Sequence, residues 1–415
     1  MSARDRGWIC LLRIVSLAGL ALVLGACATW QAPADVSDAP LRTRAVSQQK
    51  NGVGLSAAVL GPEDSLRMLG TDVTRSGVQP VWIEVRNDTD EFLWLLRAGT
   101  DPDYFSPLEV AWSAHVTLGG KTNARIDAHF DELAFPNPIP ARGTSSGLLF
   151  TNTQPVTKLL NVDLLGDRRV VPFTLLLPVP GDAAGGRDVI YRYGDGEVVD
   201  YDDLDELRSA LEVLPCCATA ADGREGGDPL NVVLVGRLDD IAAAGSRRGY
   251  RRSAGEAGAP QLLFGRPPDF VVRKLAQAGA PANWVRFWRA PVSFQGQIVF
   301  VCQAGRPFGG RFARERSDDE RLDADVDEAR NLLIQDFMYS GGLDKLAFVS
   351  GVGAVPPERP RTTAGGGSYY TDGRRAVLFF TTRPLAFSDV QVLDWEPVLE
   401  EKTLEAEQGG AADRR

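Results

Sequence analysis

The strongest candidate for ligand recognition is a short stretch in which tryptophan and arginine alternate. Trp284, Arg286 and Trp288 are separated by single residues, so a β-strand would place all three on one face. A guanidinium between two indoles can stack on them by cation–π contact and still offer its planar fork to a carboxylate or phosphate. The pattern predicts recognition of a lipid headgroup or an acidic partner. The alternative is a structural ladder beneath a loop.

A second candidate is a group of alternating carboxylates, Asp323, Asp325 and Asp327. Oxygen ligands of this kind suit hard cations, but a calcium loop needs Gly at its sixth place and Glu at its twelfth. This sequence has Glu328 and Ile334 there, so we predict no metal site. Capping and the helix dipole also explain acidic residues at a helix start. Catalysis would require Asp325 or Asp327 to act as a general base on phosphoryl or acyl groups.

The N-terminus carries the most specific signal in the chain. An apolar run over 14–24 follows three arginines, Arg4, Arg6 and Arg13. The run is too short to span a bilayer and is typical of a signal peptide. The run ends in Leu24-Gly25-Ala26-Cys27, which resembles the lipobox of bacterial lipoproteins. The resemblance implies cleavage after residue 26 and lipidation of Cys27, and two or three acyl chains, palmitate among them, anchor a protein stably. The alternative is a plain secretory signal.

Charge and composition limit the binding partners and the cellular location that the sequence allows. Cleavage removes three arginines and one aspartate, so the net charge falls from −10 to −12. Such an acidic chain is not a nucleic-acid-binding protein, and an anionic membrane should repel it, so the lipid would be its membrane contact. Only two histidines are present, which argues against a multi-His metal site, and no motif implies a cofactor. By resemblance to lipoprotein sorting, Ala28 after the cysteine implies the outer membrane, facing the periplasm.

Three cysteines remain after processing and lipidation, in a compartment that permits disulfides. Cys216 and Cys217 are adjacent, and Cys302 ends an apolar strand. An odd count leaves one thiol over if a bridge forms. We predict that Cys216 or Cys217 pairs with Cys302, because a bridge between neighbours would close a strained ring. Three buried free thiols are the alternative.

The elements that would position these residues fall into two regions. Residues 51–182 alternate apolar and polar positions over strand-length segments, which predicts a β-sandwich of immunoglobulin-like type, with 81–87 and 92–96 as a hairpin. Leucines at helical spacing predict one helix over 204–214, and the second region, from 227, alternates strands and helices. Asp325 and Glu328 predict a capping box at the start of its clearest helix. Asp372-Gly373 predicts a hairpin turn between 368–371 and 376–381.

Several motifs in this second region, taken in order, resemble the LssY-like C-terminal domain family. They include the stretches 227–236, 263–269, 285–288 and 325–330. The resemblance implies an α/β domain in a cell-envelope setting, and it implies no reaction because no activity is established for the family. Relatives commonly carry His just before the Arg-Phe-Trp motif and before the Asp-Val-Asp motif. This chain has Trp284 and the Leu322-Asp323 region at those places.

Together these observations predict an α+β protein of defined segments. These are a signal peptide (1–26), a tether (27–50), the β-sandwich (51–182), a linker with one helix (183–227), the mixed α/β LssY-like domain (228–397) and a disordered tail (398–415). The function they favour is a non-catalytic binding or scaffolding lipoprotein, with an envelope protein, a lipid or a polysaccharide as partner. A periplasmic hydrolase is the alternative.

Overall fold

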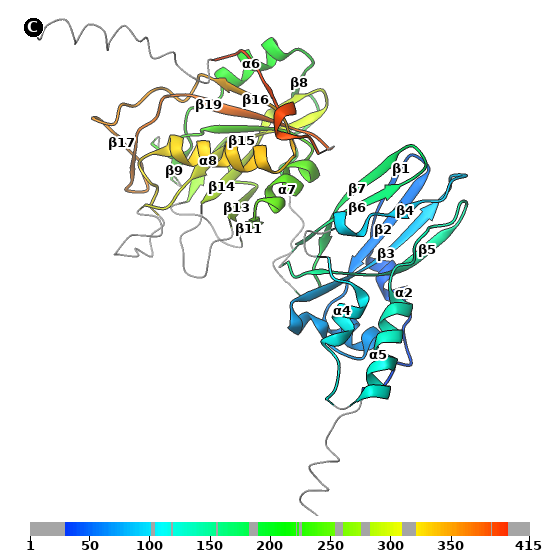
Figure 1. The fold of residues 1–415 in the computed structure, drawn as a ribbon. Helices are drawn as coiled ribbons and strands as arrows, with labels where there is room; N and C mark the ends of the chain where they lie inside the picture. Colours follow the sequence, from blue (N-terminus) through cyan, green and yellow to red (C-terminus); the bar gives the residue numbers. More distant parts are fainter. Residues whose placement is uncertain are drawn as a thin grey trace, which may run out of the picture. The chain divides into compact units, whose positions relative to one another are not determined.

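The computed structural model describes residues 30–396 apart from 101–103, 118, 155–156, 182–189, 221, 224–225, 254–259, 275–282, 309–320 and 383. The signal peptide and Cys27 therefore lie outside the described residues, as does the tail over 398–415. The chain forms two compact units that divide after residue 185 (Figure 1). The fold is of the α+β class, with open sheets and more strands than helices.

The first unit contains two antiparallel sheets over a shared core. One has the order β1-β2-β3-β5 and the other the order β4-β6-β7. Alternate side chains of strand β3, such as Val81 and Ile83, point into this core and meet residues of the opposite sheet such as Leu160 and Phe173. The strands are β1 (Val46–Lys50), β2 (Val53–Val59), β3 (Val78–Asn87), β4 (Trp94–Leu95), β5 (Thr144–Asn152), β6 (Thr157–Leu165) and β7 (Val170–Pro178).

Helices cover the outer face of the four-stranded sheet. Trp82, on the face of β3 opposite Val81, packs with Ile126 and Phe130 of the helix over 120–133. Both faces of this sheet are therefore buried. The helical segments are α2 (Ala39–Arg44), α3 (Pro62–Leu69), α4 (Pro107–Trp112), α5 (Gly120–Leu133) and the short η1 (Val73–Ser76) and η2 (Arg97–Gly99).

Three features of this unit differ from the expectations. Strand β4 pairs with β6 and not with β3, so the predicted hairpin over 81–96 is wrong: the chain crosses to the opposite sheet after Asn87. Because β3 then pairs with β2 and β5, the strand order differs from the A-B-E-D and C-F-G sheets of an immunoglobulin domain. Within the predicted tether, residues 39–44 and 46–50 form α2 and β1 and pack on the unit, with Leu41 fully buried.

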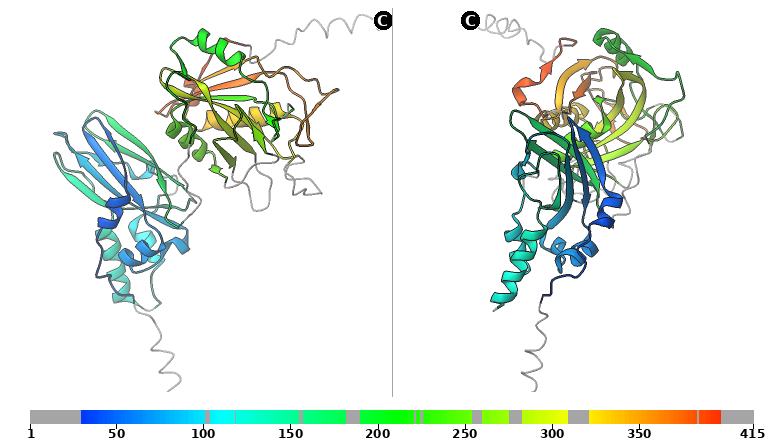
Figure 2. Two further views of the ribbon diagram at one scale, coloured as in Figure 1. Left: turned by 180° about the vertical axis from the view of Figure 1, so that it is seen from behind. Right: turned by 90° about the vertical axis from the view of Figure 1, so that its right-hand side faces the viewer.

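The second unit is a nine-stranded mixed sheet between helices (Figure 2). Its main order is β11-β13-β14-β15-β10-β19-β16-β20, with β8 paired to β14. The central pair β10–β19 is parallel, whereas the pairs from β10 through β15 and β14 to β13 are antiparallel. The strands are β8 (Val199–Tyr201), β10 (Val232–Gly236), β11 (Tyr250–Arg252), β13 (Phe270–Lys274), β14 (Trp284–Phe294), β15 (Gln297–Gly305), β16 (Leu343–Val349), β19 (Arg375–Phe380) and β20 (Gln391–Val392).

Helices cover both faces of this sheet. Helices α7 (Leu238–Arg247) and α8 (Val326–Tyr339) pack on one face, where Val232 and Leu234 of β10 point. Helix α6 (Leu204–Glu212) packs on the other face, against Val233 and Val235. The predicted linker over 183–227 thus supplies a core helix and strand β8, because the leucines of α6 bury against the sheet.

The remaining strands are short pairs beside the main sheet. They are β9 (Thr219–Ala220) with β12 (Gln261–Leu262), and β17 (Arg361–Thr362) with β18 (Ser368–Tyr369). Strand β18 does not pair with β19, so the hairpin predicted at Asp372-Gly373 is wrong; β19 instead lies between β10 and β16. In the part of the chain that the structure describes, no helix is long and apolar enough to cross a membrane.

Candidate functional site

The alternating Trp-Arg-Trp stretch lies on β14, and its three side chains do share a face, but that face is interior. Trp284, Arg286 and Trp288 are at most 2% exposed. Trp288 packs in the core beneath α6, whereas Val285 and Phe287 point to the opposite core beneath α7 and α8. The period-two pattern correctly predicted which residues point together. It could not show that a helix and a loop cover them.

Buried polar partners hold the guanidinium of Arg286. Its Nη1 donates to Oδ2 of Asp228 at 2.9 Å and to Oε1 of Gln303 at 3.0 Å. The indole of Trp284 donates to the same Gln303 oxygen at 3.0 Å, and Trp288 donates to the carbonyl of Arg266. An ion pair this deep must keep both members, because a lone buried charge is strongly unfavourable. This arrangement is that of a structural network and leaves no open fork for a ligand.

The carboxylates near residue 325 are likewise occupied. Asp325 caps α8 by accepting a hydrogen bond from the amide of Glu328 at 3.0 Å, as the sequence predicted. The other half of the predicted capping box differs, because the amide of Asp325 donates to Oδ1 of Asp323 at 3.1 Å. Asp327 accepts from the hydroxyl of Thr371 at 2.7 Å and from the amide of Asp372 at 2.6 Å. Burial raises the pKa of Asp327, and nearby Arg330 opposes that rise. These contacts fix the Asp372 turn to α8, which explains why that turn does not close a hairpin.

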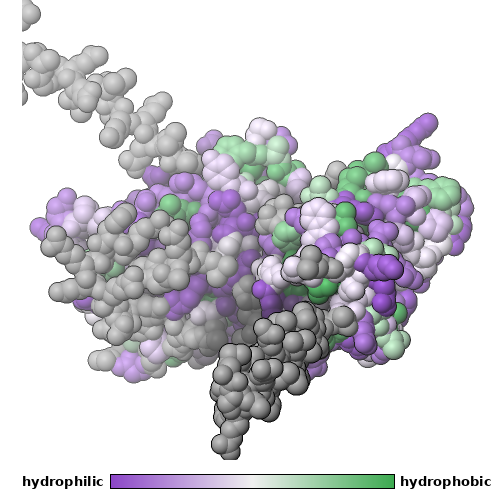
Figure 3. Space-filling model, turned by 60° about the horizontal axis from the view of Figure 1, so that its bottom comes forward, coloured by the Kyte–Doolittle hydropathy of each residue, from purple (hydrophilic) through white to green (hydrophobic). Residues whose placement is uncertain are grey.

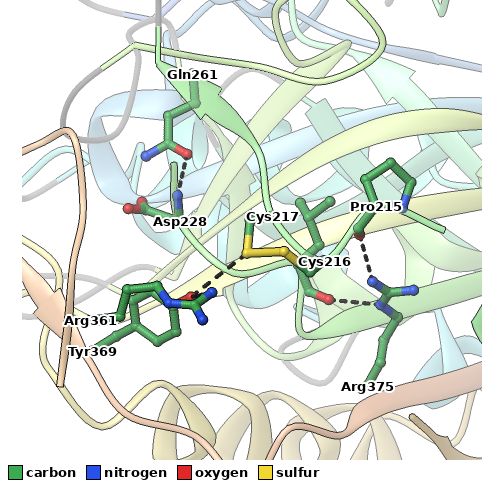
Figure 4. Close-up of a disulfide and its surroundings, with 9 residues drawn as sticks. Pro215, Cys216, Cys217, Asp228, Gln261, Arg361, Tyr369 and Arg375 are labelled. Atoms are coloured by element: carbon green, nitrogen blue, oxygen red, sulfur yellow. Dashed lines mark hydrogen bonds between the residues drawn. A yellow bond between two sulfur atoms is a disulfide. The ribbon is translucent and has the colours of Figure 1, made fainter. Parts of the chain in front are cut away.

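The cysteines pair differently from the prediction. Cys216 and Cys217 form a disulfide with each other (Figure 4). Cys302 is free and buried. Cys302 points from β15 into the core beneath α7 and α8, while the loop that carries Cys216 and Cys217 continues to Ala218 in the core beneath α6. The sheet therefore separates Cys302 from the other two. Burial raises the pKa of the Cys302 thiol well above its usual value.

The disulfide sits in a polar neighbourhood that the sequence did not indicate. The hydroxyl of Tyr369 lies 3.6 Å from Sγ of Cys217, and Arg361 lies within 3.5 Å of that hydroxyl (Figure 4). Behind the loop, the fully buried Arg375 donates to the carbonyls of Leu211 and Pro215. A third bond goes to the carbonyl of Leu230 at 2.8 Å. Desolvation lowers the pKa of Arg375 to about 10, so the guanidinium stays charged at neutral pH.

Arg375 therefore ties three segments together: the end of α6, the cysteine loop and the entry to β10. Nothing in the sequence singles it out, because an arginine at the start of an apolar strand is ordinarily exposed. Only the tertiary structure brings the carbonyls of Leu211, Pro215 and Leu230 within reach of its guanidinium.

The first unit contains an open groove. Its volume is about 530 Å³, and its lining includes Trp94, Arg97 and Asn137. The indole of Trp94 is 51% exposed, whereas Leu95 beside it is buried. Asn137 holds the wall in place: its side chain exchanges two hydrogen bonds with the backbone of Leu95, at 2.9 and 3.0 Å.

The comparisons with known proteins bear on the second unit. A family model described as LssY C-terminus matches residues 259–374. The C-terminal domain thus carries the resemblance that the sequence motifs predicted, over less than a third of the chain. The matched stretch runs from β12 to the residue before β19 and includes the buried Trp-Arg-Trp strand. None of the curated proteins compared with this chain matches it.

Replacing Arg286 should test whether its role is structural. Arg286→Met leaves Asp228 buried without its cation, so we expect a loss of about 3–5 kcal/mol in the free energy of unfolding. The double variant Arg286→Met/Asp228→Leu should recover at least half of that loss, because it removes both charges together. Urea denaturation of the parent protein, the two single variants Arg286→Met and Asp228→Leu, and the double variant measures the coupling free energy between the two side chains. Equal stability of Arg286→Met and the parent protein would contradict the structural role.

Mass mapping without reduction should find both members of the disulfide in one tryptic peptide, residues 209–224, two mass units below its reduced form. Iodoacetamide should modify Cys302 only after unfolding, because burial keeps its thiol protonated and inaccessible. A cross-linked peptide that contains Cys302 would contradict the pairing seen here.

Proposed function

We propose that this protein is a membrane-anchored cell-envelope lipoprotein whose folded units bind a partner without catalysis. The observation that carries the proposal is the groove beside Trp94, which offers an exposed indole. Arg97 lines the same groove, and its Nη2 donates to the carbonyl of Phe135 at 2.8 Å. Exposed aromatic faces with polar neighbours are what recognition surfaces require, since the ring supplies contact area at low entropic cost. The proposal places the folded units outside the cytoplasm, at the outer membrane.

The hydrolase alternative receives less support. Asp325 uses one carboxylate oxygen to cap α8, and Asp327 accepts hydrogen bonds from Thr371 and Asp372. A general base needs an oxygen within reach of the substrate proton, and in both residues oxygens are committed to holding the fold. The groove beside Trp94 lies in the other unit, so these carboxylates are not part of it.

Among possible partners, the open shape of the groove favours an extended chain such as an envelope polysaccharide. A closed pocket surrounds most of a small ligand, whereas an open groove leaves part of its ligand in solvent. The sugar face can stack on the indole of Trp94 while its hydroxyls reach the guanidinium of Arg97. On the face shown in Figure 3, hydrophobic residues form small separate patches among hydrophilic ones, which suits a surface contact with a polar polymer.

Trp94→Ala should weaken co-sedimentation of the protein with purified peptidoglycan sacculi about tenfold, since a stacking aromatic is a typical hot spot. Trp112 is 60% exposed on α4 of the same unit and provides the matched control. We expect Trp112→Ala to bind sacculi as the parent protein does. Loss of binding in both variants, or in neither, would contradict a site in the groove.

The anchor is tested by metabolic labelling with palmitate. Cys27→Ser should abolish incorporation of the label, because serine supplies no thiolate for the thioether bond. Cys10→Ser changes a cysteine of the same leader and should leave labelling intact. Label retained in Cys27→Ser, or absent from the parent protein, would contradict lipidation at this residue.

A further inference from the structure

The disulfide between Cys216 and Cys217 contributes little to holding the second unit together. Its two members are neighbours in the sequence, so the bridge links no second segment of the chain. In the chain-entropy model, a disulfide stabilises a protein more when the loop that it closes is longer, and no residue lies between these two. Stabilisation of the fold therefore does not account for this bridge.

Backbone hydrogen bonds hold the cysteine loop independently of its sulfur atoms. The amide of Leu230 donates to the carbonyl of Cys216 at 2.9 Å, and Arg375 donates to the carbonyl of Pro215 at 2.7 Å. After the pair, the amide of Ala218 donates to a carbonyl of the loop before β10 at 3.0 Å. Because none of these bonds involves a sulfur atom, opening the disulfide leaves them in place.

A hydroxyl and a cation lie beside the sulfur of Cys217. The hydroxyl of Tyr369 is 3.6 Å from Sγ of Cys217, and Nη1 of Arg361 is 3.5 Å from that hydroxyl (Figure 4). Arg361 and Tyr369 are directly opposite each other in the strand pair β17–β18, which holds the two groups together. Hydrogen-bond donors and cations both stabilise a thiolate. The nearby carboxylate of Asp228 pairs with Arg286, which offsets its negative charge.

The pair is accessible from outside the protein, unlike the third cysteine. Cys216 and Cys217 are half-buried, whereas Cys302 is fully buried. The sheet separates Cys302 from the pair, so its thiol cannot attack the disulfide. Electrons for a reduction must therefore come from the thiols of another molecule.

We propose that Cys216 and Cys217 form a redox site that exchanges with the dithiol of a thioredoxin-like protein. A thiolate of this partner attacks Sγ of Cys216 and bonds to it, and the electron pair of the broken disulfide leaves on Sγ of Cys217. The hydroxyl of Tyr369 donates to that leaving thiolate. The partner's other thiolate then displaces Cys216, so the partner becomes the disulfide and its thiol protons pass to this chain. This activity goes beyond the binding proposed for the groove beside Trp94 and does not depend on it.

Reduction of the folded protein tests the site on the full chain carrying Cys10→Ser/Cys27→Ser, in which only the pair and Cys302 remain as cysteines. Reduced thioredoxin should open the pair without denaturant, and iodoacetamide should then alkylate both cysteines of the tryptic peptide over 209–224. Cys302 should stay unmodified, and the midpoint of thermal unfolding should shift by less than about 4 °C. The proposal is overturned if the pair is reduced only under conditions in which Cys302 also reacts.

A trapped intermediate and a pair of tyrosine variants test the direction of the exchange. Thioredoxin whose second active-site cysteine is serine should form a mixed disulfide with Cys216, and iodoacetamide should alkylate the released Cys217. Tyr369→Phe should slow the reduction about tenfold, because the leaving thiolate loses its donor. Tyr370→Phe removes the neighbouring hydroxyl, which bonds to Asp325, and should react as the parent does.

Three results of these experiments would overturn the proposal. They are the absence of a mixed disulfide, a mixed disulfide at Cys217, and equal rates of reduction for Tyr369→Phe and Tyr370→Phe.

Discussion

The buried ion pair between Arg286 and Asp228 is the constraint on which the second unit depends. Asp228 precedes β10, and Arg286 lies in β14, which is two strands away in the sheet. The ion pair therefore ties the loop before β10 to strand β14. Gln303 of β15, directly opposite Arg286, accepts a hydrogen bond from the same guanidinium. Because an unpaired charge at this depth is costly, any arrangement of the loop that separated the two residues would be unfavourable.

Arg286, Asp228 and Gln303 form a layer of buried polar groups, and Arg375 extends this layer to the other side of β10. Asn231 precedes the first residue of β10 and exchanges hydrogen bonds with the backbone of Ala304, and the next strand, β19, begins at Arg375. The carbonyls that accept hydrogen bonds from Arg375 belong to α6, the cysteine loop and Leu230. One layer of buried polar groups therefore positions the helix, the disulfide and the sheet together.

This use of polar groups bears on function. The residue types that suggest chemistry in the C-terminal domain, an arginine between tryptophans and a series of aspartates, act as internal ties. An accessible aromatic side chain lies instead in the groove beside Trp94, which no motif indicates.

The sequence by itself determined the local features. Period-two alternation placed Trp284, Arg286 and Trp288 on one face, and leucine spacing predicted α6. The capping role of Asp325 followed from residue type and position. These features depend on neighbours within a few residues. Motif order further predicted the LssY resemblance that the family model supports.

Only the tertiary structure decided which faces are buried and which strands pair. Residues 81–96 read as a hairpin, yet β4 joins the opposite sheet, because burial of Leu93 and Leu95 in the shared core outweighs the local turn signal. The pairing of Cys216 with Cys217 depends on the sheet that lies between them and Cys302. Such contacts join residues far apart in the chain, and their energies depend on packing that no local pattern encodes.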